Sequence, residues 1–201
     1  IDLNQTGPST AYGVVAPPPD DSGTSHYSVI DSRGMTVSAT ETINGTFGSL
    51  LVVPEIGVVM NNEMDDFTTI PGEANLFGLR QSDWNLPEPG KRPLSSMSPT
   101  ILLRDGKTAV TAGASGGPRI ITGTLQVMLR MIYEDLAPVD AVAAPRIHHQ
   151  WLPETLYLEE EAIHLQPSLE AYGHTIKTTG GVGVVQAIRV HEDGYQPASD
   201  P

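Results

Sequence analysis

The chain has 201 residues, 39% of them hydrophobic, which is enough for one sizeable core or for one lobe of a larger one. Its 24 Asp and Glu residues against 11 Lys and Arg residues give a net charge of −13, so phosphate-rich partners such as nucleic acid and anionic membranes are poor candidates. The absence of cysteine excludes disulfides, thiolate catalysis and zinc–thiolate sites.

The first segment, residues 1–23, contains YGVVAPPPDDSG, and its prolines, aspartates and Ser-Gly pair predict an exposed, extended tail. The sequence begins without methionine, and we expect it to be a fragment or a processed subunit. The pattern changes at Thr24. Residues 26–31 (HYSVID) and 35–42 (MTVSATET) alternate on either side of Ser-Arg-Gly, which predicts a β-hairpin.

A second hairpin is predicted over residues 99–114, where PTILLRDG and KTAVTAGA meet at Asp105-Gly106. Between the two hairpins lies a long stretch without periodicity, residues 61–98. A loop of that length inside a compact domain is usually functional.

The strongest helical pattern covers residues 119–136, with apolar side chains at helical spacing. These are Ile121, Leu125, Met128, Leu129 and Ile132. A short second helix is predicted over residues 138–145, with Pro138 in its first turn.

Strands return at residues 155–160, 174–179 and 183–191, and the last one turns at Glu-Asp-Gly. Strands, then helices, then strands predict a layered α+β domain.

Cleavage of the chain between Gly23 and Thr24 would make Thr24 an N-terminal nucleophile. A threonine freed at a chain start carries its own base, because its α-amine has an ordinary pKa of about 7.7–8.0 and can accept the hydroxyl proton. Gly23 has no side chain to shield its carbonyl from the Thr24 hydroxyl, so an N-to-O acyl shift followed by hydrolysis would free that amine. Taken alone, a Gly-Thr pair before a strand is common and more often has no catalytic meaning.

Seven segments from Thr24 onward change that reading: TSHYSVID, ETINGTFGS, NNEMDDF, GKRPLSSMSPTI, GASGGPRIIT, APRIHHQWLP and the final ASDP. In content, order and spacing the sequence resembles the small subunit of the γ-glutamyltranspeptidases, N-terminal-nucleophile hydrolases that mature by autocleavage. The resemblance implies a four-layer αββα sandwich completed by a large subunit absent from this chain. It divides the chain into a tail, residues 1–23, and a catalytic small-subunit domain, residues 24–201.

The resemblance also assigns catalytic roles. Thr24 would be the nucleophile, and the hydroxyl of Thr42 would bond it. Gly116 and Gly117 would form the oxyanion hole, since two glycines before a helix can aim backbone N–H groups at a developing charge. The family commonly has proline where this chain has Ser115.

Substrate-binding roles follow in the same way. Asn44, Glu63 and Asp66 would hold the α-amino end of a γ-glutamyl group, for which carboxylates are suitable partners. Some family members have glutamine in place of Glu63. Ser95 and Ser96 would donate hydroxyls to the substrate carboxylate.

The implied activity is γ-glutamyl transfer from glutathione and similar compounds to water, amino acids or peptides. It would proceed through a γ-glutamyl-Thr24 ester after cleavage at Gly23–Thr24, with the large subunit of the same precursor as partner. No cofactor, metal or nucleic acid is implied, and the family's usual location is periplasmic, extracellular or surface-anchored. Three alternatives stay open: a cephalosporin acylase, a poly-γ-glutamate depolymerase, and a non-catalytic or unprocessed homologue.

Two further motifs resemble ligand sites, but we expect neither to bind a ligand. His148 and His149 are adjacent and have no third ligand at metal-site spacing, so we expect a structural role. Gly180, Gly181 and Gly183 lack the Lys-Ser/Thr pair of a phosphate loop and predict a turn that leads into a strand.

Overall fold

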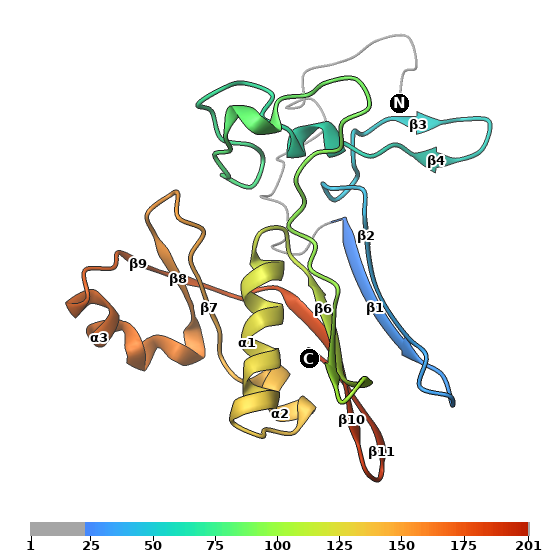
Figure 1. Ribbon diagram of the computed structural model, residues 1–201. Helices are drawn as coiled ribbons and strands as arrows, with labels where there is room; N and C mark the ends of the chain where they lie inside the picture. The colour runs from blue at the N-terminus through green and yellow to red at the C-terminus, as the bar shows by residue number, and fades with distance from the viewer. Residues whose placement is uncertain (1–22, 201) are drawn as a thin grey trace.

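The computed structural model describes residues 23–200, so the predicted tail lies outside the described residues except for Gly23. A four-stranded antiparallel sheet with the order β11-β10-β6-β5 forms the centre (Figure 1). Its strands are β5 (Thr100–Arg104), β6 (Lys107–Ser115), β10 (Val184–His191) and β11 (Gly194–Ser199). Asp105 and Gly106 join β5 to β6 with φ values of 52° and 75°, which confirms the predicted turn.

Two helices cover one face of this sheet, α1 (Arg119–Tyr133) and α2 (Pro138–Ala143). The core lies between helices and sheet. It comprises Val110, Ala112, Ala114, Ile120, Val127, Met128, Met131, Ala141, Val142, Val185 and Ala187. Pro138 occupies the first turn of α2, as the sequence predicted.

The buried face of α1 coincides only in part with the apolar residues whose spacing predicted the helix. Of the five apolar residues at helical spacing, Ile121 and Leu125 are 48% and 53% exposed, and only Met128 is buried. The residues that the helix buries are Ile120, Gly123, Thr124, Val127, Met128 and Met131. Gly123 allows close packing, since a Cβ there would lie 2.6 Å from the Val182 carbonyl oxygen. It also ends earlier than predicted, at Tyr133, shortly before Asp135 takes a φ of 54°.

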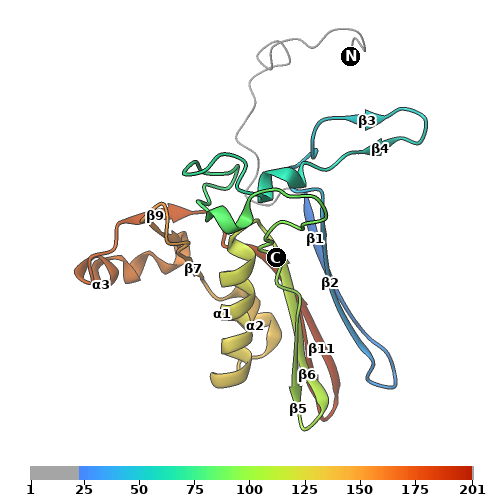
Figure 2. The same cartoon turned by 45° about the horizontal axis from the view of Figure 1, so that its top comes forward.

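The hairpin of β1 (Thr24–Ile30) and β2 (Thr36–Thr42) lies on the opposite face of the sheet (Figure 2). Its contacts with β6 are partly polar: the Ser28 hydroxyl lies 3.0 Å from that of Thr111, and the His26 ring packs directly over Gly113. Helices, sheet and hairpin therefore form successive α, β and β layers, and the α+β prediction is confirmed.

A smaller sheet, β7-β8-β9, lies beside α1, with strands Ile147–His148, Leu156–Glu159 and Ile176–Thr179. A 3-10 helix (Glu160–Leu165) and α3 (Gln166–Ala171) connect β8 to β9, which run parallel. Leu156, Leu158 and Ala162 form its own small core. Gly183, with a φ of 73°, precedes β10, in keeping with the predicted turn.

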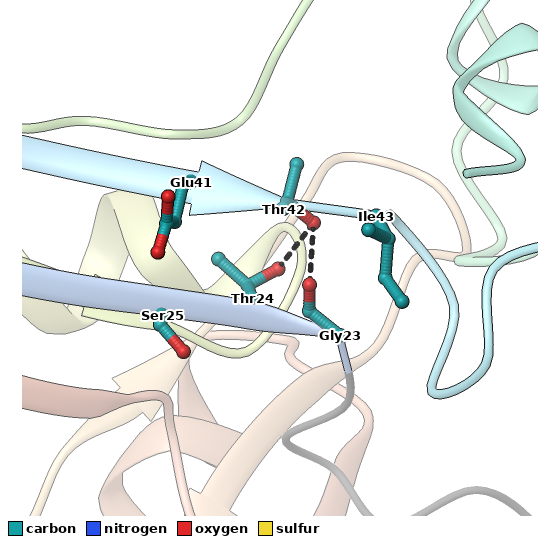
Figure 3. Close-up of a pocket in the computed structure, with 6 residues that line it drawn as sticks. All are labelled: Gly23, Thr24, Ser25, Glu41, Thr42 and Ile43. Carbon is teal, nitrogen blue, oxygen red and sulfur yellow. Dashed lines mark hydrogen bonds between the residues drawn. The ribbon is translucent and has the colours of Figure 1, made fainter. Parts of the chain in front are cut away.

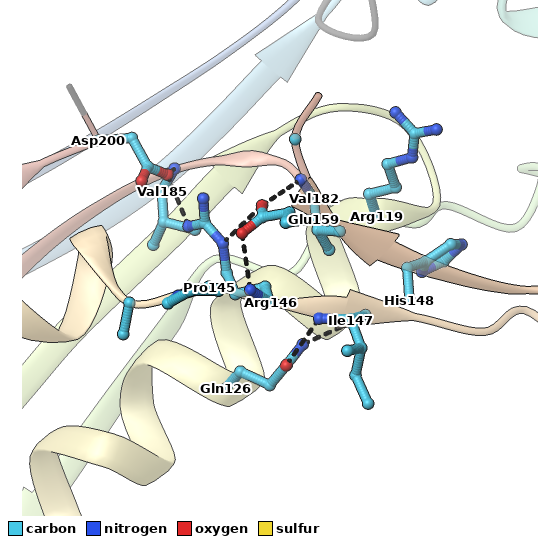
Figure 4. A network of polar contacts seen from close by, with 12 residues as sticks. Arg119, Gln126, Pro145, Arg146, Ile147, His148, Glu159, Val182, Val185 and Asp200 are labelled. Atoms are coloured by element: carbon cyan, nitrogen blue, oxygen red, sulfur yellow. Dashed lines mark hydrogen bonds and ion pairs between the residues drawn. The ribbon is translucent and has the colours of Figure 1, made fainter. Parts of the chain in front are cut away.

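A buried ionic network ties the small sheet to the end of the chain (Figure 4). The Arg146 guanidinium lies 3.3 Å from a Glu159 carboxylate oxygen and 2.7 Å from Asp200. Glu159 also accepts the backbone N–H groups of Arg146 and Val182, and Asp200 accepts that of Val185. Every charge in the network therefore has a partner, which buried ions require.

The segment from residue 43 to 98 is mostly irregular, and its second part, residues 61–98, was predicted to be so. It contains a short hairpin, β3 (Val52–Val53) with β4 (Val58–Val59), which projects from the body (Figure 1). Two 3-10 helices follow, Glu63–Asp66 and Asp83–Asn85. Within residues 23–200, no helix is long and apolar enough to cross a membrane.

Candidate active site

Thr24 and Thr42 face each other across the β1–β2 ladder, where the antiparallel register pairs the first residue of one strand with the last of the other. Their hydroxyl oxygens lie 2.9 Å apart (Figure 3). The hairpin predicted from the sequence thus brings together two side chains eighteen positions apart.

The Thr42 hydroxyl has a determined role in this hydrogen-bond network. It donates to the Gly23 carbonyl at 3.0 Å and accepts the backbone N–H of Asn44 at 2.8 Å. Because a hydroxyl has one hydrogen, Thr24 must be the donor in the Thr24–Thr42 bond. A lone pair on the Thr24 oxygen is then left for attack.

The Gly23 carbonyl receives a second hydrogen bond, from the Ile43 N–H at 2.9 Å. Gly23 has a φ of 80°, and a Cβ there would lie 2.4 Å from the Gly45 carbonyl oxygen. Only glycine fits this backbone position without displacement. The peptide bond before Thr24 is therefore polarised by two donors and closely confined.

One pocket brings together most of the predicted site residues, although they come from the hairpin, the long loop and the start of α1. It is lined by Thr24, Thr42, Asn44, Asp66, Ser95, Ser96 and Gly117, with walls formed by Phe77, Met97 and Ile120. Gly23 lines an adjoining hollow with Thr24 (Figure 3).

Two predicted residues lie just outside the lining. Glu63 interacts with Asp66, and Gly116 directly precedes the pocket residue Gly117.

Within residues 23–200, neither Glu63 nor Asp66 forms an ion pair. Burial first, and then the negative charge of Asp66, raise the pKa of Glu63 to about 7. Burial likewise raises the pKa of Asp66. The Glu63 Oε1 atom is buried without a hydrogen-bond partner in the described residues. A bound ammonium group would supply both the missing charge and the missing donors.

The two glycines before α1 form a tight turn beside the pocket. Gly116 and Gly117 have φ values of 122° and 58°, and their carbonyls accept the N–H groups of Arg119 and Ile120. A Cβ at Gly117 would lie 2.8 Å from the Phe77 ring. The two glycines therefore allow both the left-handed turn and a close approach of the pocket wall.

Within residues 23–200, neither Ser95 nor Ser96 donates its hydroxyl hydrogen. The Ser95 oxygen accepts the Met97 N–H at 3.2 Å, which leaves its hydrogen free for a ligand. Ser96 lines the same pocket. An anionic group in this pocket would find donors from both side chains.

The histidine pair forms separate contacts. His148 is 2% exposed and bonds Thr122 and Gln150 through its two ring nitrogens, whereas His149 accepts the Trp151 N–H. Sequence reasoning missed the pocket walls Phe77, Met97 and Ile120. Apolar residues in an irregular loop or at the first turn of a helix carry no periodic signal.

The family model for gamma-glutamyltranspeptidase matches residues 1–201. The chain belongs to the gamma-glutamyltranspeptidase family. It is 44% identical over 208 residues to the glutathione hydrolase proenzyme of Escherichia coli K12, covering 100% of this chain and 35% of that protein. The chain spans about a third of the length of this relative and of the corresponding proenzymes of two Pseudomonas strains.

Solved structures give the same assignment. A mutant of Helicobacter pylori gamma-glutamyltranspeptidase superimposes with a TM-score of 0.83 at 43% identity, covering 88% of this chain and 98% of that one. Cephalosporin acylase from Bacillus halodurans superimposes with a TM-score of 0.74 at 27% identity, over 88% of this chain and 32% of that one. These neighbours confirm the N-terminal-nucleophile hydrolase fold predicted from the sequence.

Proposed function

We propose that this chain is the catalytic part of a longer precursor that cleaves itself at Gly23–Thr24 and then transfers γ-glutamyl groups. The observation that carries the proposal is the 2.9 Å contact between the hydroxyls of Thr24 and Thr42, next to the doubly hydrogen-bonded Gly23 carbonyl. The remainder of the precursor, about two thirds of the length of its relatives, would complete the sandwich as the large subunit.

Maturation begins when the Thr24 oxygen attacks the Gly23 carbonyl carbon. The Thr42 hydroxyl and the Ile43 N–H, which already bond the carbonyl oxygen, stabilise the negative charge that develops there. The Gly23–Thr24 C–N bond breaks, the hydroxyl proton moves to the departing nitrogen, and an ester forms. Water then hydrolyses the ester and leaves Thr24 with a free amine.

Turnover uses the same hydroxyl. The free α-amine of Thr24 takes the hydroxyl proton as the oxygen attacks the γ-amide carbonyl of a compound such as glutathione. The N–H groups at Gly116 and Gly117 stabilise the oxyanion. The amine then returns the proton to the leaving nitrogen. Water, an amino acid or a peptide resolves the γ-glutamyl ester, giving hydrolysis or transfer.

Recognition of the donor rests on charge and hydrogen bonding. Glu63 and Asp66 would pair with its α-ammonium, and Asn44 would orient it. Ser95 and Ser96 would donate to its α-carboxylate. This arrangement favours a free α-amino acid head group over the glutaryl side chain that a cephalosporin acylase would accept, because glutaryl lacks the ammonium.

The test uses full-length protein and three probes: γ-glutamyl-p-nitroanilide, glutaryl-p-nitroanilide and poly-γ-glutamate. We expect release of p-nitroaniline from the first probe, together with a transient γ-glutamyl adduct on the chain that begins with Thr24. Preferred cleavage of glutaryl anilide or of the polymer would replace this proposal with one of the two rival activities. No adduct with any probe would indicate a non-catalytic homologue.

A further inference from the structure

We propose that Gln150, held by His148, is a positioning residue for the pocket of Thr24. It fixes the turn of residues 75–79 and so keeps Phe77 against Gly117. The expected effect on catalysis rests on the proposed function, whereas the effect on the turn does not.

His148 provides a rigid anchor. It lies on β7, is almost completely buried, and contacts the Thr122 hydroxyl of α1 at 2.8 Å through Nδ1. Its Nε2 lies 2.9 Å from the Gln150 side-chain oxygen. Thr122 is in the first turns of α1, five positions after Gly117, so the imidazole connects the start of this helix to Gln150.

The hydrogen bonds determine how Gln150 is oriented. Its amide nitrogen donates to the carbonyls of Phe77 at 3.1 Å and Leu152 at 3.2 Å, which uses both of its hydrogens. Its oxygen must therefore accept from His148 Nε2. The imidazole therefore carries a hydrogen on Nε2, and burial lowers the pKa of His148.

The turn that Gln150 contacts is a compact unit. The Asn75 side-chain oxygen accepts the N–H groups of Phe77 and Leu79 at 3.1 Å and 3.0 Å, and the Asn75 and Leu79 backbones also bond each other. Among residues 23–200, two side chains from outside the turn bond its backbone. Asp65 accepts the Leu76 N–H at one end, and Gln150 donates to Phe77 at the other.

Phe77 transmits this attachment to the site. It is a pocket wall, and its ring packs so closely on Gly117 that a Cβ there would lie 2.8 Å away. Loss of the hydrogen bond from Gln150 to the Phe77 carbonyl would let the Phe77 ring move away from Gly117. A small displacement of a site wall can lower a rate by about 10²-fold even when the altered residue is remote from the chemistry.

The first arm of the test needs no substrate. Hydrogen exchange is measured on full-length Gln150→Met, which keeps the side-chain volume and loses the donors. Gln166→Met is the matched control, since Gln166 lies on α3 and, among the described residues, its side chain bonds the exposed Glu170. We expect faster exchange at the amides of residues 76–79 in Gln150→Met alone. Unchanged exchange would overturn the proposal. If Gln150→Met does not fold, Gln150→Glu removes the same donors and is read in the same way.

The second arm is a double-mutant cycle with γ-glutamyl-p-nitroanilide. We expect Gln150→Met and Phe77→Ala each to lower kcat/KM by between about ten- and a hundredfold. The double variant should be no worse than Phe77→Ala, because Gln150 acts through Phe77. If the two substitutions lower kcat/KM in a fully additive way, Gln150 does not act through Phe77. An inactive wild-type protein would contradict the proposed function, and the exchange arm would still decide the role of Gln150.

Discussion

The hydroxyl of Thr42 lies 2.9 Å from that of Thr24 and also donates to the carbonyl of Gly23 at 3.0 Å. A single side chain thus contacts both the proposed nucleophile and the peptide bond that this nucleophile would break. The pairing of the two threonines in the β1–β2 register makes this geometry a direct consequence of the hairpin.

Replacement of Thr42 with valine should therefore slow maturation. Valine keeps the β-branched shape that suits a strand but removes the donor to Gly23, and loss of one such donor typically slows an acyl transfer by about 10²–10³-fold. A time course of precursor cleavage on denaturing gels measures the effect. Thr42→Ser, which keeps the hydroxyl, serves as the control, and a Thr42→Val precursor that matures at the wild-type rate would contradict this role.

The affinity for a γ-glutamyl donor should weaken as the pH falls below 7. The pKa of Glu63 in the empty site is about 7, because burial and Asp66 disfavour its charge, and only the ionised form attracts the substrate ammonium. KM should rise by up to about tenfold per pH unit below that value. Steady-state kinetics from pH 5.5 to about 8.5 would show this.

Glu63→Gln should flatten that pH profile and raise KM at high pH. Glu55→Gln, on the exposed turn between β3 and β4, should leave the profile unchanged. A wild-type KM that is constant across this range would show that Glu63 does not bind the ammonium.

The same carboxyl should make the ligand-free protein less stable as the pH rises. The folded-state pKa of Glu63, about 7, lies above its ordinary value of 4.5, so between these values the folded state binds more protons than the unfolded state. The free energy of unfolding then decreases with increasing pH through this window. Between pH 5 and about pH 8, the melting temperature should decrease less for Glu63→Gln than for the wild type. An identical decrease in melting temperature in both proteins would contradict a role for Glu63 in this pH dependence.

Loss of charge at Glu159 should destabilise the protein. Glu159→Gln would leave the buried Arg146 with Asp200 as its remaining anionic partner in the network and would weaken the bond to the Val182 N–H. Breaking a buried ion pair costs about 3–5 kcal/mol. Chemical denaturation of the full-length protein measures this cost. The neighbouring Glu160 is exposed, and Glu160→Gln should change the free energy of unfolding by less than about 0.5 kcal/mol.

The elements with local signals were predictable from the sequence. Alternation identified β1 and β2, Asp105-Gly106 identified the β5–β6 turn, and Pro138 marked the start of α2. The inward face of α1 is also apolar at helical spacing, since Ile120, Val127 and Met131 are buried there. Ile121 and Leu125, on the neighbouring stripe, are 48% and 53% exposed. Apolar spacing therefore predicts the helix but does not choose between its two apolar stripes.

The candidate site, too, contains residues that could be predicted from the sequence and residues that could not. Family resemblance pointed to Thr24, Asp66 and Ser95, but their convergence depends on a long loop that returns to the hairpin. Neither Phe77 nor Gln150 could be found from a local pattern, since each acts through a partner distant in the sequence. Arg146 and Asp200 are likewise 54 positions apart, and nothing in their local sequence predicts the ion pair.

The most direct test of the central claim is an intact-mass measurement on the denatured full-length protein, as wild type and as Thr24→Ala. The account predicts that the wild type separates into two chains, one of which begins TSHYSV, and that Thr24→Ala remains a single uncut chain. Cleavage at Gly23–Thr24 in the alanine variant, or a wild-type precursor that stays intact, would contradict the assignment of Thr24 as the self-activating nucleophile.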